Sequence, residues 1–197
     1  MTIQLLFIRH AITDWNQQRR IQGWTDIALS DAGRAHLKTC SLPSKWRNTI
    51  CYTSTLTRTI ETAQLLKVNA IHPTPLLREM HWGLWEGQTL AQMRQGDPVN
   101  FAENERRGLD FRPDEGESPR EVRTRLDRWL NSLEEDLQQA IVVTHKGVIR
   151  AAISLACDWD MQSKYKHSMD WSCAHEFSYS SAKGLALEHL NVSLGSP

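Results

Sequence analysis

Two short runs of apolar residues, far apart in the chain, each lead into a histidine. The first is Leu5-Leu-Phe-Ile8, followed by Arg9 and His10, and the second is Ala140-Ile-Val-Val143, followed shortly by His145. Runs of this length without polar alternation are typical of strands that are buried on both faces of a parallel sheet. Because ligands of open α/β sheets bind beyond the carboxyl ends of the strands, both histidines are expected at such a site.

The segments between and after these runs alternate between helical and extended patterns. Ser54 is expected to cap a helix over residues 55–66, and Ser118 one over residues 119–137. Residues 174–190 are typical of a terminal hairpin. Strands that alternate with helices predict an α/β fold with three layers, α/β/α, around a mostly parallel central sheet.

Size and charge restrict the domain organisation and the partners. The chain has 197 residues, and its 23 Lys and Arg are balanced by 23 Asp and Glu. This length suits one domain, 1–197, with a polar lid insertion around 97–116. A net charge of zero argues against nucleic acid or an anionic membrane as a partner. With no signal peptide or membrane-spanning run, a cytoplasmic protein is expected, and a homodimer is compatible with the sequence.

The cysteines and histidines outside the two strand ends suggest no metal site. The four cysteines are scattered and contain no Cys-x-x-Cys pair. Free thiols in a reducing compartment are therefore favoured over a zinc site or a redox pair. The other histidines do not show familiar ligand spacing either. We expect neither a metal nor a cofactor.

Positive side chains are expected to gather near the two histidines. Arg58 falls in the first turn of its predicted helix, where the helix N-terminus adds partial positive charge. Arg9 and Arg58 can each present a fork of donors to a phosphate, and Asn16 can add a neutral donor. His145, if protonated, supplies a further cationic donor. The alternative for Arg58 is a surface ion pair with Glu61 or Glu79.

These residue types fit the in-line transfer of a phosphoryl group. His10 can attack phosphorus through a neutral ring nitrogen, and nearby arginines favour that form because like charge lowers the pKa of an imidazole. A backbone carbonyl bonded to the other nitrogen would fix the tautomer. Glu79 is the candidate general acid for the leaving alcohol, and then the base for the water that cleaves phosphohistidine.

The motifs, taken in chain order, resemble those of the histidine phosphatase superfamily, in its phosphoglycerate mutase-like branch. The resemblance covers nearly the whole chain. Each motif alone is weak, but the set is specific because each member lies in the expected strand-end or helix-start setting. The matching segments are Arg9-His10-Ala11, Trp15-Asn16, Gly23-Trp-Thr-Asp-Ile-Ala-Leu29, Ser54-Thr-Leu-Thr-Arg58-Thr-Ile-Glu-Thr-Ala63, Glu79-Met-His-Trp-Gly-Leu-Trp-Glu-Gly87, Gly116-Glu-Ser118 and Thr144-His145-Lys-Gly147.

The resemblance implies a role for each matching side chain. His10 is implied as the phosphorylated nucleophile and Glu79 as the proton donor. Arg9, Arg58 and His145 are implied as the phosphate pocket. The positions that match substrate contacts in the family are Asn16, Gln22 and Gly23.

Two departures from the family pattern bear on activity and substrate. Ala11 replaces the signature glycine, where a methyl group could shift the backbone that supports His10. Met80 and Trp82 stand where mutases carry polar substrate contacts, which puts phosphoglycerate recognition in doubt. The mutases that the chain resembles are also usually longer between the acid loop and the second histidine. A phosphomonoesterase for a small phosphorylated metabolite is therefore favoured.

Other functions stay open at this point. A 2,3-bisphosphoglycerate-dependent mutase remains an alternative, because Arg106, Arg107 or Arg112 could recognise a substrate carboxylate. A catalytically silent binding module is disfavoured, since all five core positions are present. The resemblance does not choose between α-ribazole phosphatase-like and broad-specificity members. Residues 157–171 show no clear pattern and are interpreted as a loop or short helices that border the site.

Overall fold

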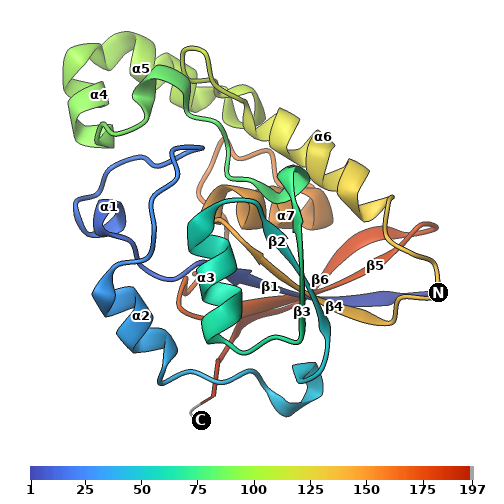
Figure 1. Ribbon diagram of the computed structural model, residues 1–197. Helices are drawn as coiled ribbons and strands as arrows, with labels where there is room; N and C mark the ends of the chain where they lie inside the picture. Colours follow the sequence, from blue (N-terminus) through green and yellow to red (C-terminus); the bar gives the residue numbers. More distant parts are fainter. Residues whose placement is uncertain (196–197) are drawn as a thin grey trace.

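The computed structural model describes residues 1–195, and a six-stranded sheet forms its middle layer (Figure 1). The strand order is β3-β2-β4-β1-β5-β6. The first four strands in this order run parallel to one another, and β5 and β6 are antiparallel additions at one edge. The strands are β1 Ile3–Arg9, β2 Ile50–Ser54, β3 Ala70–Thr74, β4 Gln139–Thr144, β5 Ala174–Ser180 and β6 Gly184–Val192.

Helices cover both faces of this sheet, which confirms the predicted three-layer α/β/α class (Figure 1). The α-helices are α1 Asp14–Gln17, α2 Asp31–Leu37, α3 Thr57–Leu65, α4 Leu90–Gly96, α5 Pro98–Arg106, α6 Pro119–Leu130 and α7 Lys146–Cys157. Short 3-10 turns are η1 Ser44–Trp46, η2 Pro75–Leu77, η3 Gly83–Trp85 and η4 Gly108–Asp110.

The apolar run of β1 divides its side chains between two cores. Leu5 and Phe7 pack into the core beneath α6 and α7, whereas Leu6 and Ile8 pack into the core beneath α2 and α3. The apolar residues of β4 divide in the same way. Because alternate side chains of a strand point to opposite faces, a strand covered on both sides must be apolar throughout. This burial is the physical reason for the two unbroken apolar runs.

The pairing of β1 with β4 brings the ends of both strands to the same level. Arg9 lies opposite Thr144 in the parallel ladder. The next residue continues the pairing, since the His10 N–H donates to the Thr144 carbonyl at 2.9 Å. His145 follows Thr144 directly and is the N-cap residue of α7. The two histidines therefore leave adjacent strands at the same edge of the sheet.

The helix predicted over residues 55–66 is present as α3, but the prediction that Ser54 caps it is wrong. Helix α3 begins at Thr57, and its N-cap residue Leu56 makes no side-chain capping bond. The distant Asp26 replaces the cap, because its carboxylate accepts from the Thr57 N–H at 2.8 Å and from the Thr57 hydroxyl at 2.7 Å. Ser54 is the last residue of β2, and this placement leaves its hydroxyl beside the end of β4.

Helix α6 starts as predicted but ends at Leu130, seven residues before the expected position 137. Ser118 forms the capping box at its start. At its end, the Asn131 side chain donates to the Asp127 carbonyl at 2.8 Å, and the Ser132 hydroxyl donates to the Trp129 carbonyl at 2.7 Å. Side chains that bond the last carbonyls compete with continued helical hydrogen bonding. The predicted hairpin at 174–190 is present as β5 and β6.

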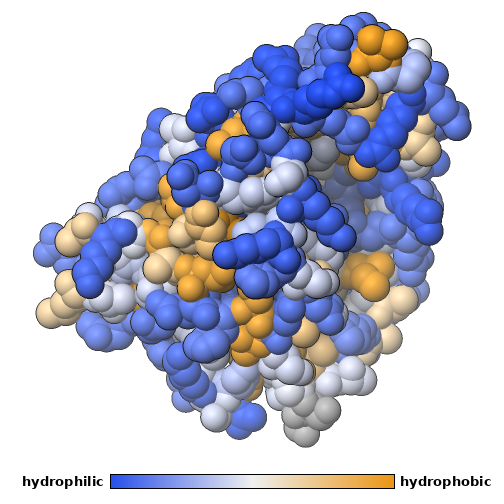
Figure 2. All heavy atoms as spheres, turned by 180° about the vertical axis from the view of Figure 1, so that it is seen from behind, coloured by the Kyte–Doolittle hydropathy of each residue, from blue (hydrophilic) through white to orange (hydrophobic). Residues whose placement is uncertain are grey.

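The polar segment 97–116, predicted as a lid insertion, contains helix α5 and turn η4. Phe101 anchors α5, since its ring stacks on Trp85 with centroids 5.4 Å apart. In Figure 1, α4 and α5 stand away from the sheet, and in Figure 2 hydrophilic side chains predominate at that end of the molecule. Within residues 1–195 no helix has both the length and the apolar character needed to cross a bilayer.

Candidate active site

The two strand-end histidines lie close together in the interior. The rings of His10 and His145 have centroids 5.2 Å apart, with an angle of 61° between their planes. His10 is 6% exposed, and His145 is fully buried. The adjacent ends of β1 and β4 thus bring two imidazoles into one small site.

A backbone contact fixes the tautomer of His10. Its Nδ1 lies 2.7 Å from the Ala11 carbonyl oxygen. Because a carbonyl only accepts, Nδ1 carries the proton and Nε2 keeps its lone pair. Burial, followed by the charges of Arg9 and Arg58, lowers the pKa of His10 well below its ordinary value. The ring is therefore neutral at neutral pH, as a nucleophile must be.

Alanine at position 11 retains the contacts that support His10. Both of these contacts use main-chain atoms: the Ala11 carbonyl accepts from His10, and the Ala11 N–H donates to the Thr62 hydroxyl at 3.1 Å. The methyl group takes no part in either bond. The departure from the family's glycine therefore leaves the support of the imidazole in place.

His145 differs from the cationic donor that the sequence suggested. Burial, followed by the charge of Arg58, lowers its pKa well below the ordinary value. Its Nε2 is 2.8 Å from the Ser54 hydroxyl oxygen. This contact gives Ser54 a place at the site in addition to its role at the end of β2. His145 is neutral in the ligand-free protein, and an arriving dianion favours its protonation because opposite charge raises the pKa of an imidazole.

Arg58 lies inside the protein, so the alternative of a surface ion pair with Glu61 or Glu79 is wrong. Its guanidinium donates to the Gly23 carbonyl at 2.7 Å and to the Thr25 carbonyl at 3.0 Å. Glu61 pairs with Arg34 instead, at 3.1 Å. Burial lowers the pKa of Arg58, and the nearby Glu79 carboxylate opposes this shift.

Three buried nitrogen atoms at this site lack hydrogen-bond partners among the residues that the structure describes. They are Nε of Arg9, Nε of Arg58 and Nδ1 of His145. A buried donor without a partner costs roughly 1–3 kcal/mol, so proteins rarely leave several together. A tetrahedral anion carries acceptor oxygens on all sides and can satisfy both guanidinium donors at once, together with Nδ1 of His145 when that nitrogen carries a proton. The unpartnered atoms therefore fit a phosphate group.

Glu79 lies against the start of α7, next to His145. Its Oε1 accepts from the Met80 N–H at 2.8 Å, and its Oε2 accepts from the Gly147 N–H at 3.2 Å. A Cβ atom on Gly147 would lie 2.2 Å from the Glu79 Oε1. Glycine at 147 therefore allows the carboxylate to reach the site. This position suits proton transfer to or from a group bound between the histidines.

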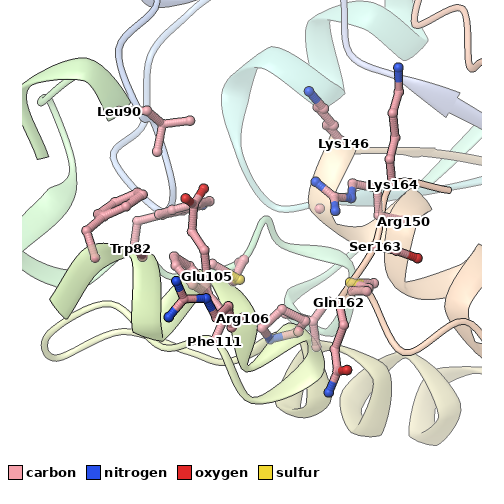
Figure 3. A pocket seen from close by; sticks show the side chains of 18 of the residues that line it. Trp82, Leu90, Glu105, Arg106, Phe111, Lys146, Arg150, Gln162, Ser163 and Lys164 are labelled. Carbon is pink, nitrogen blue, oxygen red and sulfur yellow. The ribbon is translucent and has the colours of Figure 1, made fainter. Parts of the chain in front are cut away.

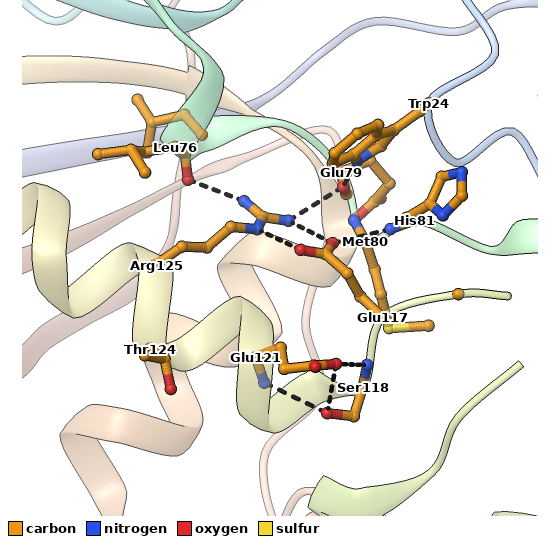
Figure 4. A network of polar contacts seen from close by, with 12 residues as sticks. Trp24, Leu76, Glu79, Met80, His81, Glu117, Ser118, Glu121, Thr124 and Arg125 are labelled. Carbon is orange, nitrogen blue, oxygen red and sulfur yellow. Dashed lines mark hydrogen bonds and ion pairs between the residues drawn. The ribbon is translucent and has the colours of Figure 1, made fainter.

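A network of polar contacts around Arg125 holds the backbone of the Glu79 loop (Figure 4). The guanidinium donates to the Leu76 carbonyl at 2.8 Å and to the Glu79 carbonyl at 3.0 Å. It also forms a two-pronged ion pair with Glu117, whose other contact is the His81 N–H at 2.9 Å. Sequence reasoning missed Arg125, because an arginine on an amphipathic helix usually faces solvent. The Gly-Glu-Ser element was the only signal for Glu117.

The three further residues matched to substrate contacts are placed by side-chain and backbone bonds. Asn16 lies within α1 and completes the capping box of the N-cap residue Thr13, since its Oδ1 accepts from the Thr13 N–H at 3.1 Å. The buried Gln22 accepts from the Thr13 hydroxyl at 3.0 Å. Gly23 has φ +55° and leaves no room for a Cβ, which would lie 1.9 Å from the Glu86 Oε1. Gly23 therefore serves the site through its carbonyl, which accepts from Arg58.

A cavity of about 670 Å³ opens beside Glu79 and extends towards α5. Of the three arginines considered for carboxylate recognition, Arg106 lines this cavity. Arg112 instead forms an ion pair with Glu121 and bonds the Gly116 carbonyl. Residues 161–164 supply part of the wall, which gives a place to the segment 157–171 that the sequence left unassigned. Across residues 1–195, no three His, Cys, Asp or Glu side chains cluster as metal ligands would.

The buried histidines predict a loss of stability in acid. Burial lowers the pKa of His175 to about 4 and lowers those of His10 and His145 as well. Unfolded histidines titrate near pH 6.5. Between about pH 6.5 and 4 the unfolded chain binds protons that the native chain does not. The free energy of unfolding therefore decreases as the pH is lowered through this range, by up to about 1.4 kcal/mol per pH unit for each histidine.

Urea denaturation across this pH range measures the effect. His175→Gln is expected to flatten the slope, whereas His72→Gln, at an exposed position, is the matched control. Equal slopes for His175→Gln and the unmodified chain would contradict the assignment.

Comparisons with known proteins agree with the resemblance seen in the sequence. A model of the histidine phosphatase superfamily (branch 1) matches residues 5–192. The 2,3-bisphosphoglycerate-dependent phosphoglycerate mutase 2 of Gloeobacter violaceus is 30% identical over 160 residues, which span 76% of this chain and 73% of the mutase. Bacillus stearothermophilus YhfR has a TM-score of 0.81 at 26% identity, covering 99% of this chain and 98% of its own. A mycobacterial glucosyl-3-phosphoglycerate phosphatase in complex with VO3 has a TM-score of 0.76 at 26% identity, covering 96% and 99%.

Proposed function

The chain belongs to branch 1 of the histidine phosphatase superfamily, and we propose that it hydrolyses phosphate monoesters of small metabolites through a phosphohistidine on His10, without a metal ion. The carrying observation is the neutral His10 ring, whose Nδ1 is bonded to the Ala11 carbonyl beside unpartnered cationic and imidazole nitrogens. The free Nε2 is then available for in-line attack.

The first chemical step transfers the phosphoryl group to His10. Arg9, Arg58 and His145 hold the equatorial oxygens while Nε2 of His10 displaces the alcohol. The P–N bond forms as the P–O bond to the alcohol breaks. Glu79, which reaches the start of α7, gives the leaving oxygen its proton.

The second step returns the enzyme to its starting state. The Glu79 carboxylate takes a proton from a water molecule, whose oxygen attacks the phosphorus of phosphohistidine. The P–N bond breaks, inorganic phosphate is released, and His10 regains its neutral Nε2. The cations neutralise the phosphate throughout, so the proposal requires no metal ion.

We favour hydrolysis over a mutase reaction, in which the phosphoryl group is passed back to a hydroxyl group of the substrate, because of the side chains that line the cavity. The apolar side chains of Met80 and Trp82 line it next to Glu79. They give no polar anchor for a small hydroxy acid at that point. Arg106 is the specific observation that favours the mutase as a second candidate, since it lines the same cavity. We also infer a cytoplasmic location, which the four unbridged cysteines support.

The test is turnover of p-nitrophenyl phosphate in the presence of a chelator. Hydrolysis that persists in chelator and is inhibited by orthovanadate is the expected result, because vanadate imitates five-coordinate phosphorus. An absolute metal requirement, or rates unaffected by vanadate, would contradict the mechanism. Incubation of 3-phosphoglycerate with 2,3-bisphosphoglycerate separates the two candidates, since a mutase yields the isomer faster than free phosphate.

A further inference from the structure

The cavity beside Glu79 is larger and more varied in its walls than the phosphate site itself. Its volume of about 670 Å³ is typical of pockets that enclose drug-sized ligands. On one side lie Trp82, Leu90 and Phe111, and on the opposite side lie Lys146, Arg150 and Lys164 (Figure 3). We call Lys146, Arg150 and Lys164 the basic wall.

The basic wall carries charge that the protein does not neutralise. Within residues 1–195, none of its three side chains forms an ion pair. The carboxylates that line the cavity are Glu79, which reaches towards the phosphate site, and Glu105, which pairs with Arg94 at 2.7 Å. Lys146 and Arg150 lie over the rings of Trp171 and Trp159, at 5.1 Å and 5.2 Å, and the charge of Glu79 acts on both. A ring contact leaves the positive charge in place, so the basic wall can bind an anion.

The loop that carries Lys164 is held in place by contacts with η4. The Leu109 N–H donates to the Asp160 carbonyl at 2.9 Å. Gly108 has φ +57°, and a Cβ there would lie 2.4 Å from the Asp160 carbonyl oxygen. Further along, the Trp159 indole donates to the Ser163 carbonyl at 3.0 Å. Lys164 thus extends from a braced loop, and the cavity is formed before a ligand arrives.

The wall opposite is built from packed rings. Trp82 and Phe111 contact each other edge to face, with centroids 5.7 Å apart, and Phe101 stacks on Trp85 behind them. Flat apolar surfaces of this kind favour an apolar or ring-shaped body in a ligand. Glu105 and Arg106 lie on the same side as these rings (Figure 3), so a ligand that fills the cavity meets rings and this charged pair on one side and the basic wall on the other.

We propose that the alcohol portion of the substrate has an apolar, ring-sized body and carries a second anionic group, a phosphate or a carboxylate, which Lys164 and Arg150 bind. This rests on the proposed function, since the reacting phosphate must occupy the site between the histidines. Lys146 directly follows His145 in the chain and also lines the cavity. Burial, followed by the charges of Arg9 and Arg150, lowers the pKa of Lys146.

The experiment compares three aryl phosphates with the purified full chain. Phenyl phosphate has no second anion, 3-carboxyphenyl phosphate adds a carboxylate, and 1,3-phenylene bisphosphate adds a phosphate. At least one of the two doubly anionic esters is expected to have a kcat/KM about tenfold above that of phenyl phosphate, because hydrogen bonds to charged groups contribute on this scale. The ester preferred, after correction for the two equivalent phosphates, identifies the second anion.

A pair of lysine variants from the same loop gives the matched control. Lys164→Gln is expected to abolish the preference, whereas Lys166→Gln, exposed but outside the cavity, retains it. Equal kcat/KM for all three esters, or a preference that survives Lys164→Gln, overturns the proposal while leaving the phosphatase intact. Failure of the unmodified chain to hydrolyse phenyl phosphate overturns the proposed function itself.

Discussion

Replacement of His10 by alanine is expected to lower kcat for p-nitrophenyl phosphate by about four orders of magnitude or more. The variant loses the atom that forms the P–N bond, and the remaining cations can only hold the phosphate. Initial rates at saturating substrate measure this loss. His72→Ala changes an exposed histidine of β3, whose ring contacts Tyr52, and this control variant should keep its rate.

A trapping experiment distinguishes loss of the nucleophile from loss of the fold. The phosphohistidine is not expected to survive acid. The unmodified chain is therefore quenched in alkali after brief exposure to a substrate with a labelled phosphoryl group. Label should reside in the peptide that contains His10, and His10→Ala should remain unlabelled while its urea midpoint near neutral pH stays close to that of the parent. Residual turnover of a few per cent, with the fold intact, would exclude His10 as the nucleophile.

Replacement of Glu79 by glutamine is expected to lower kcat/KM for an alkyl phosphate by about 10²–10⁴. The loss should be much smaller for p-nitrophenyl phosphate, because p-nitrophenolate is a good leaving group that needs little protonation. Glutamine can still accept from the Gly147 N–H, so the loop should keep its position. Because Glu79 also serves the second step, p-nitrophenyl phosphate should give a burst of nitrophenolate followed by slow turnover.

Paired rate measurements on the two esters separate this role from a structural one. Glu105→Gln changes a carboxyl group of the same cavity that pairs with Arg94, and it should not create a difference between the esters. Equal losses for the alkyl and aryl esters in Glu79→Gln would mean that Glu79 does not protonate the leaving oxygen.

The features predicted best from the sequence are those with a local physical cause. The strands β1 and β4 were recognisable because burial on both faces requires unbroken apolar runs. The start of α6 was recognisable because a capping box is contained within four residues. From these elements alone, His10 and His145 were expected at strand ends, whereas the direct pairing of the two strands was not predicted.

The features predicted poorly depend on partners distant in the chain. Ser54 has the local pattern of a helix cap, but the Asp26 carboxylate arrives from another loop and bonds Thr57. Arg125 resembles a solvent-facing residue of α6 until the carbonyls of the Glu79 loop reach it. The protonation of His145 depends on burial that no local pattern reveals. The segment 157–171 has no periodicity because contacts with η4 determine its course.

The ladder between β1 and β4 also determines how the chemistry tolerates change. The main-chain pairing of the two strands sets the spacing of the two imidazoles. Arg9 lies opposite Thr144, and the N–H of His10 donates to the Thr144 carbonyl. Substitutions among similar apolar residues within these strands change the packing of the core but leave the register of the two strands unchanged. Insertion or removal of a single residue in either strand would turn one ring to the opposite side of the sheet. The distance between the rings of His10 and His145 thus depends on the number of residues in the two strands rather than on the details of side-chain packing.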